Sequence, residues 1–167
     1  MSALRPPGGR TLDVACIGNA IVDVLAHTDD SFLDRIAGRW EVTRKIRGTT
    51  VRNTLDAQWV LQHRFVQLHM VDTADPPKYE AIVMIGYDRQ GERYVAHWTD
   101  IFGGGASAMG YGKRAGNSIA FEFAYPDGPF YNTFTWEPET AGWTMLLESS
   151  SKDGKRAVFA EDTLRRK

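Results

Sequence analysis

Residues that form tight turns recur at intervals of roughly ten positions through most of this chain, and this spacing constrains the fold more than any other feature. The clearest turns are Asp88-Arg89-Gln90-Gly91, Ala115-Gly116-Asn117, Pro126-Asp127-Gly128 and Lys152-Asp153-Gly154. Each contains residues that tolerate a positive φ, as hairpin turns require. The segments between them are too short for βαβ units, so the spacing predicts antiparallel hairpins in an all-β sandwich or barrel.

The segments between the turns predict roughly ten strands. They cover residues 40–47, 49–56, 65–72, 79–88, 93–100, 107–113, 118–125, 130–137, 143–150 and 156–165. Within residues 118–125, Ile119, Phe121 and Phe123 share one face while Glu122 lies on the other, which is the alternation of a strand with one buried face. Consecutive hairpins of this kind need a second sheet or closure into a barrel. We predict an antiparallel up-and-down barrel, which leaves no free edge strand.

One short helix is expected before the first strand. Residues 28–31 offer N-cap side chains, and Phe32, Leu33 and Ile36 follow at helical spacing before Gly38. A chain of 167 residues is the size of one domain. We therefore assign residues 29–167 to a single barrel domain and residues 1–28 to a leader that is poorly packed and dispensable for folding.

The leader contains an apolar run, residues 14–26, that Asn19 and Asp23 interrupt. The run is too short to span a bilayer and too polar for a secretory signal, so neither is predicted. Residues 13–24 resemble the opening strand of the ribokinase and adenosine kinase family, and the resemblance implies that Asp23 would hold sugar hydroxyls. The Gly-Ala-Gly-Asp stretch that supplies the catalytic base and anion hole of those kinases has no counterpart here, so kinase activity is rejected.

Charge and cysteine content limit the partners and the compartment. Twenty basic side chains stand against 21 acidic ones, a formal net charge of −1, so the chain has no basic field to attract nucleic acid or an anionic membrane. Cys16 is the single cysteine and has no intrachain disulfide partner. A cytoplasmic location is expected, because that compartment keeps thiols reduced.

Two motifs make the barrel prediction more specific. Gly38-Arg39-Trp40 resembles the Gly-x-Trp signature of lipocalins and other calycins, in which the indole closes one end of the barrel and a basic side chain from the last strand covers it. The resemblance assigns that covering role to Arg165. Together with the turn at 86–88 and the strand at 94–100, the chain resembles an uncharacterised bacterial calycin-like domain family over residues 32–167. This resemblance implies a fold and carries no reaction.

No metal or cofactor site is predicted. His63, His69 and His97 form no His-x-His pair and have no cysteine ligand beside them. Haem is also not expected, because no histidine follows His97 in the C-terminal strands. The glycine-rich residues 102–113 fit neither a phosphate-binding loop nor a nucleophile elbow. They are interpreted as a flexible connection followed by a strand whose small residues let the backbone approach a neighbour or a ligand, with a mobile portal loop as the functional variant.

Aromatic residues on alternate positions predict a lined interior, because tyrosine and tryptophan combine apolar area with a polar tip. The residues expected to point inward and contact a ligand are Tyr94, Trp98, Phe121, Phe123, Phe134, Trp136 and Met145, with Gln67 and His69 as polar contacts. The leading hypothesis is a barrel that binds a small apolar or amphipathic molecule.

Two alternatives remain open from the sequence. The first is an isomerase, cyclase or hydrolase that uses the same interior, with His69, His97 or a buried carboxylate as general base. The second is an interaction module whose barrel is filled with its own side chains and whose outer aromatic patch mediates homo-oligomerisation.

Overall fold

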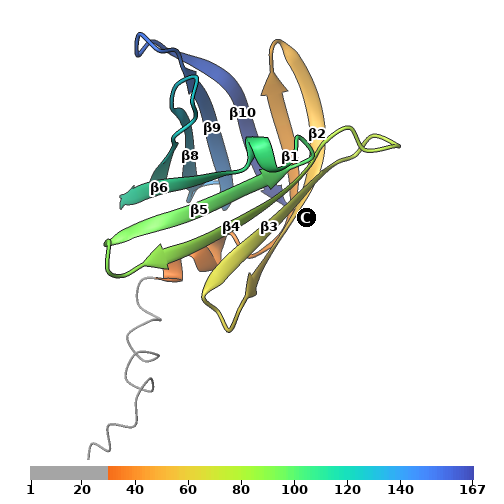
Figure 1. Cartoon of the computed structure of the whole chain (residues 1–167). Helices are drawn as coiled ribbons and strands as arrows, with labels where there is room; N and C mark the ends of the chain where they lie inside the picture. The colour runs from red at the N-terminus through yellow and green to blue at the C-terminus, as the bar shows by residue number, and fades with distance from the viewer. Residues whose placement is uncertain (1–29) are drawn as a thin grey trace, which may run out of the picture.

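The computed structural model describes residues 30–167, which form a closed barrel of ten antiparallel strands (Figure 1). The strands are β1 (Gly38–Ile46), β2 (Thr49–Val60), β3 (Phe65–Asp72), β4 (Glu80–Asp88), β5 (Arg93–Asp100), β6 (Ala108–Ala115), β7 (Ser118–Phe123), β8 (Phe130–Glu137), β9 (Gly142–Ser150) and β10 (Arg156–Arg166). Each strand pairs with its neighbours in sequence, and β1 also pairs with β10. The predicted up-and-down topology is confirmed. The predicted leader, with Cys16 and Asp23, lies outside the described residues.

The strand boundaries follow the turn chemistry. β3, β5 and β8 coincide with the predicted segments, whereas β2 continues to Val60, beyond the predicted residue 56. In the turn between β4 and β5, the Asp88 carboxylate accepts hydrogen bonds from the Gly91 amide at 3.0 Å and from Arg93 Nε at 3.2 Å. These bonds fix the end of the hairpin, as is typical of an aspartate at the first position of a turn.

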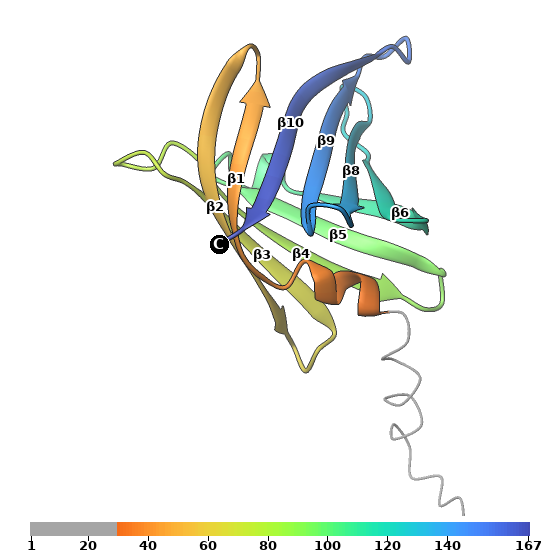
Figure 2. The same ribbon diagram turned by 180° about the vertical axis from the view of Figure 1, so that it is seen from behind.

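One end of the barrel is closed by the short 3-10 helix η1 (Asp30–Arg35), which lies at the end where β1 starts (Figure 2). Phe32, Leu33 and Ile36 are all buried there. The Phe32 ring meets the ring of Trp143 edge-on at 5.2 Å, and the Trp143 indole donates to the Arg35 carbonyl at 3.3 Å. The predicted helix is therefore present, and its side chains fill this end of the barrel. Short connecting helices are frequently of the 3-10 type.

Gly38 and Trp40 lie at the closed end as predicted, but the covering cation is Arg166 and not Arg165. The guanidinium of Arg166 lies 4.5 Å from the centre of the Trp40 ring. Trp40 and Arg166 are directly paired across β1 and β10, so both side chains lie on the same face of the sheet. Arg165 is one position away and therefore points outward, where it is exposed.

Candidate functional site

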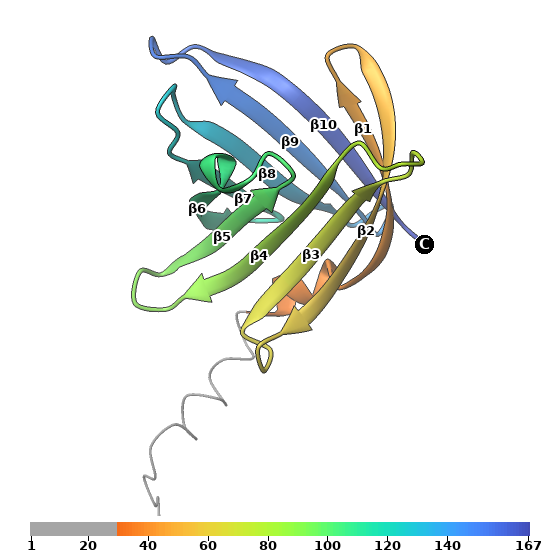
Figure 3. The same cartoon turned by 45° about the vertical axis from the view of Figure 1, so that its right-hand side comes forward.

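The opposite end of the barrel contains a cavity of about 450 Å³. Its rim is formed by the loops that follow the odd-numbered strands. One of these loops runs from β5 to β6 and includes the 3-10 turn η2 (Gly104–Ala106), which Figure 3 shows beside the end of β5. Phe102 lines the cavity and is 73% exposed, so the cavity reaches the surface at this rim. The apolar wall includes Ile46, Val51, Trp98, Phe123, Phe130, Leu147 and Phe159.

An ion pair between two adjacent strands lies at the floor of the cavity. Arg44 on β1 and Asp162 on β10 are directly paired in the sheet and both point inward. Arg44 Nε donates to Asp162 Oδ1 at 2.7 Å and Nη2 donates to Oδ2 at 2.6 Å. Burial by itself would lower the pKa of Arg44. The hydrogen bonds and negative charge of Asp162 outweigh this effect, so the pKa of Arg44 is raised. Arg44 therefore stays charged and joined to its carboxylate.

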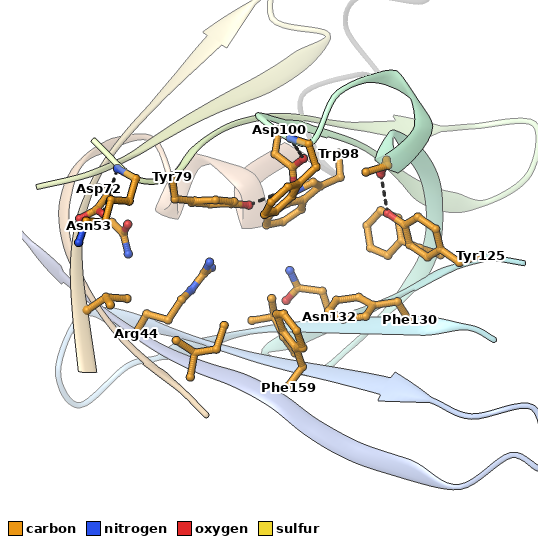
Figure 4. A pocket seen from close by; sticks show the side chains of 17 residues that line it. Arg44, Asn53, Asp72, Tyr79, Trp98, Asp100, Tyr125, Phe130, Asn132 and Phe159 are labelled. Atoms are coloured by element: carbon orange, nitrogen blue, oxygen red, sulfur yellow. Dashed lines mark hydrogen bonds between the residues drawn. The ribbon is translucent and has the colours of Figure 1, made fainter. Parts of the chain in front are cut away.

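Tyr79 lies above Arg44, with its ring centre 5.4 Å from the guanidinium carbon. Its hydroxyl donates to Asp100 Oδ2 at 3.4 Å (Figure 4). Burial raises the pKa of Tyr79, and the nearby positive charge of Arg44 only partly opposes this shift. The phenol is thus a neutral hydrogen-bonding group at the cavity wall.

Two aspartates at the rim hold the loops. Asp72 accepts hydrogen bonds from the backbone amides of Ala74 at 3.0 Å and Lys78 at 3.2 Å. Asp100 accepts one from the Phe102 amide at 3.0 Å. Both carboxylates therefore have structural partners at the mouth of the cavity, and neither is arranged as a free general base.

Two asparagines carry polar atoms with no hydrogen-bond partner among the described residues. These atoms are Nδ2 of Asn53 and both Nδ2 and Oδ1 of Asn132. Asn132 is 1% exposed and Asn53 is 3% exposed, and both line the cavity (Figure 4). Leaving a buried polar group unpaired costs about 1–3 kcal/mol, so such groups in a folded protein indicate a role for the site.

The apolar residues predicted for the interior lie in the core of the barrel or pack against it, but only part of the set lines the cavity. Trp98 and Phe123 line it. Outside the cavity lining, the core contains Tyr94, Phe121, Phe134 and Met145, and Trp136 is partly buried against it. Phe121 and Phe134 meet edge-on at 5.7 Å, and Arg35 of η1 lies 5.7 Å from the Trp136 ring. These side chains fill the closed end of the barrel. The sequence predicted that they face inward, but not at which end of the barrel they lie.

Gln67 and His69 were predicted as polar contacts inside the barrel, and the structure places both on the outer face. Val66, Leu68 and Met70 are the buried residues of β3, and the intervening positions face away from the core. The His69 ring nitrogen Nε2 lies 2.6 Å from Glu80 Oε1 on this outer surface. The alternation of apolar side chains along the strand already indicates this orientation.

The remaining candidate histidines, His97 and His63, are also away from the cavity. His97 is on the outer face of β5, where Nε2 lies 2.8 Å from Ser107 Oγ. His63 follows β2 and stacks on Trp59 with ring centres 3.8 Å apart. An enzyme that uses His69 or His97 as a general base inside the barrel is therefore inconsistent with this geometry.

The polar residues of the site were not predicted from the sequence. Arg44, Asn132 and Asp162 each occupy an inward position between apolar neighbours on a strand. A polar residue at such a position was the available signal. The pairing of Arg44 with Asp162, however, depends on closure of β1 against β10, which is a contact between residues 118 positions apart.

The described part of the chain has no group of three or more His, Cys, Asp or Glu side chains that could hold a metal ion. Within residues 30–167, no helix is both long and apolar enough to cross a membrane.

The fold and site define a ten-stranded antiparallel β-barrel with one closed end and one apolar cavity at the other. The chain belongs to the family described as "Protein of unknown function (DUF1579)", whose pattern matches residues 27–166. No curated protein matches the sequence. Among solved structures, the chain is similar to a redesigned β-barrel at 13% identity, with 80% of this chain and 93% of that chain covered and a TM-score of 0.33.

Proposed function

We propose that this protein binds a small amphipathic molecule inside the barrel. The observation that carries the proposal is the cavity of about 450 Å³, which has an apolar wall and the unpaired polar atoms Asn53 Nδ2, Asn132 Nδ2 and Asn132 Oδ1. A volume of this size lies in the range of small-molecule sites, which are mostly apolar with a few fixed polar groups. Burial of apolar ligand surface would contribute about 25 cal/mol per Å².

The two ends of the barrel differ in packing, and this difference supports the proposal. The end covered by η1 is packed with aromatic side chains, including Phe32, Trp40 and Trp143, which are almost fully buried. The other end has space between its walls and a rim that reaches solvent at Phe102. A barrel filled throughout with its own side chains, as the interaction-module alternative requires, does not account for this space.

The test is a titration of the purified protein with Nile red, a neutral apolar dye whose emission increases in apolar surroundings. Saturable binding at one site per chain is expected. Val51→Trp would place a large side chain in the cavity and should abolish binding, because Val51 lines it. Ile82→Trp adds the same side chain at a position that is 40% exposed on β4 and should leave binding unchanged.

Two outcomes would overturn the proposal. One is the absence of saturable dye binding by the folded protein. The other is equal loss of binding in Val51→Trp and Ile82→Trp, since the dye would then respond to a general effect of the added indole. Far-ultraviolet circular dichroism of each variant establishes that the barrel is intact.

A further inference from the structure

We infer that the ligand of this cavity carries an uncharged head group that donates and accepts hydrogen bonds at once, as a primary carboxamide does. This inference rests on the proposed function and specifies the chemistry of the same site. It is drawn from the position of Asn132, from its neighbours and from the distribution of charge around the cavity.

The neighbours of Asn132 in the sheet offer its side-chain amide no hydrogen-bond partner. On the inner face of β8 its neighbours are Phe130 and Phe134, and across the sheet it pairs with Phe121 of β7 and Leu147 of β9. None of these four side chains can donate or accept a conventional hydrogen bond. Both polar atoms of the amide are unpaired, and Figure 4 shows the group directed into the cavity.

A side-chain amide offers an N–H donor beside a carbonyl acceptor. Its full complement is a group with an acceptor beside a donor, and a primary carboxamide meets this requirement with two hydrogen bonds to one partner. An ester or a carboxylate offers acceptors alone, so it would leave Asn132 Oδ1 unpaired in an apolar wall. The unpaired Nδ2 of Asn53, which also lines the cavity, is a further donor for a ligand carbonyl.

The charges around the cavity disfavour an anionic head group. The charged residues of the lining are Arg44 and Lys78 against Asp72 and Asp100, and Asp162 lies directly behind Arg44. Arg44 is the cation at the cavity floor, and it is already engaged by both oxygens of Asp162. A ligand carboxylate would therefore enter a site with no net positive charge and lose its hydration there, which is unfavourable.

The experiment compares three ligands with the same alkyl chain as competitors of Nile red at neutral pH: decanamide, decanoate and methyl decanoate. Decanamide is expected to bind the wild-type protein about tenfold more tightly than either of the others, which is the effect of one buried hydrogen bond left unmade. In Asn132→Leu this preference should fall to about twofold or less, with the affinity for methyl decanoate unchanged. Thr133→Val, the next residue of β8, faces outward and should retain the full preference.

The ligand series on the wild-type protein decides the inference even if a variant fails to fold. Decanoate binding as tightly as decanamide would overturn it, and so would a preference for decanamide that survives in Asn132→Leu, because the selective contact would then lie elsewhere. Equal affinities for all three ligands would show that water satisfies Asn132 and would also overturn it. In each of these cases Nile red still binds, whereas failure of the dye and of all three ligands would refute the proposed function itself.

Discussion

Arg166 and Trp40, 126 positions apart in the sequence, are in contact at the closed end of the barrel. The guanidinium lies 4.5 Å from the centre of the indole, and its two terminal nitrogens donate to the carbonyls of Ala37 at 3.3 Å and Arg35 at 3.2 Å. The Trp40 indole in turn donates to the Ile36 carbonyl at 2.7 Å. The last strand thereby contacts the first strand, the last residue of η1 and the segment that follows it.

Arg166→Ala should lower the free energy of unfolding by about 1–2 kcal/mol, because it removes a cation–π contact with the buried Trp40 and two hydrogen bonds to backbone carbonyls. Urea denaturation followed by tryptophan fluorescence measures the change. Arg165→Ala is the matched control, since Arg165 is exposed on the adjacent position, and it should change stability by less than about 0.5 kcal/mol. Equal effects of the two substitutions would contradict the assignment of Arg166 to the closed end.

The Arg44–Asp162 pair should behave as one unit. Arg44→Met leaves the fully buried Asp162 without its cation, and Asp162→Leu leaves Arg44 without its carboxylate. Each single variant should therefore lose about 3–5 kcal/mol of stability. The double variant should recover most of this loss, since two apolar side chains replace both charges. A double-mutant cycle from urea denaturation measures the coupling, and additive losses would show that the two side chains do not depend on each other.

These two pairs show what sequence can and cannot specify. Turn residues such as Asp88 and Gly116 have local conformational requirements, so the order and approximate limits of the strands could be predicted. The face of each residue also follows from alternation, and on that basis Gln67 and His69 should have been placed outside. By contrast, the location of the empty space depends on which end η1 fills, and this is a result of packing between distant segments. Trp98 and Phe121 were thus indistinguishable by sequence, although only Trp98 lines the cavity.

Trp98 should be required for ligand binding and His69 should not. Trp98→Ala removes an aromatic side chain from the cavity wall and should weaken Nile red binding by about 1–3 kcal/mol, in line with the apolar area lost. His69→Ala removes the contact with Glu80 on the outer face and should leave the dissociation constant within about twofold. Fluorescence titration of both variants checks this. A loss of binding in His69→Ala equal to that in Trp98→Ala would contradict the observed orientation of β3.

Tyr79 should make the barrel less stable in alkaline solution. Burial raises the pKa of this phenol above its ordinary value of 10.0, so the folded protein holds the proton more tightly than the unfolded chain does. The contribution of this pKa difference to the free energy of unfolding is complete below pH 10.0 and is lost as the pH rises through the pKa of the folded state. Tyr79→Phe has no proton to lose, so its stability should fall less between pH 9 and pH 11 than that of the wild-type protein. Tyr111→Phe on the outer face controls for removal of a tyrosine. Urea denaturation at both pH values measures the difference, and parallel losses in Tyr79→Phe and the wild type would refute the role of Tyr79.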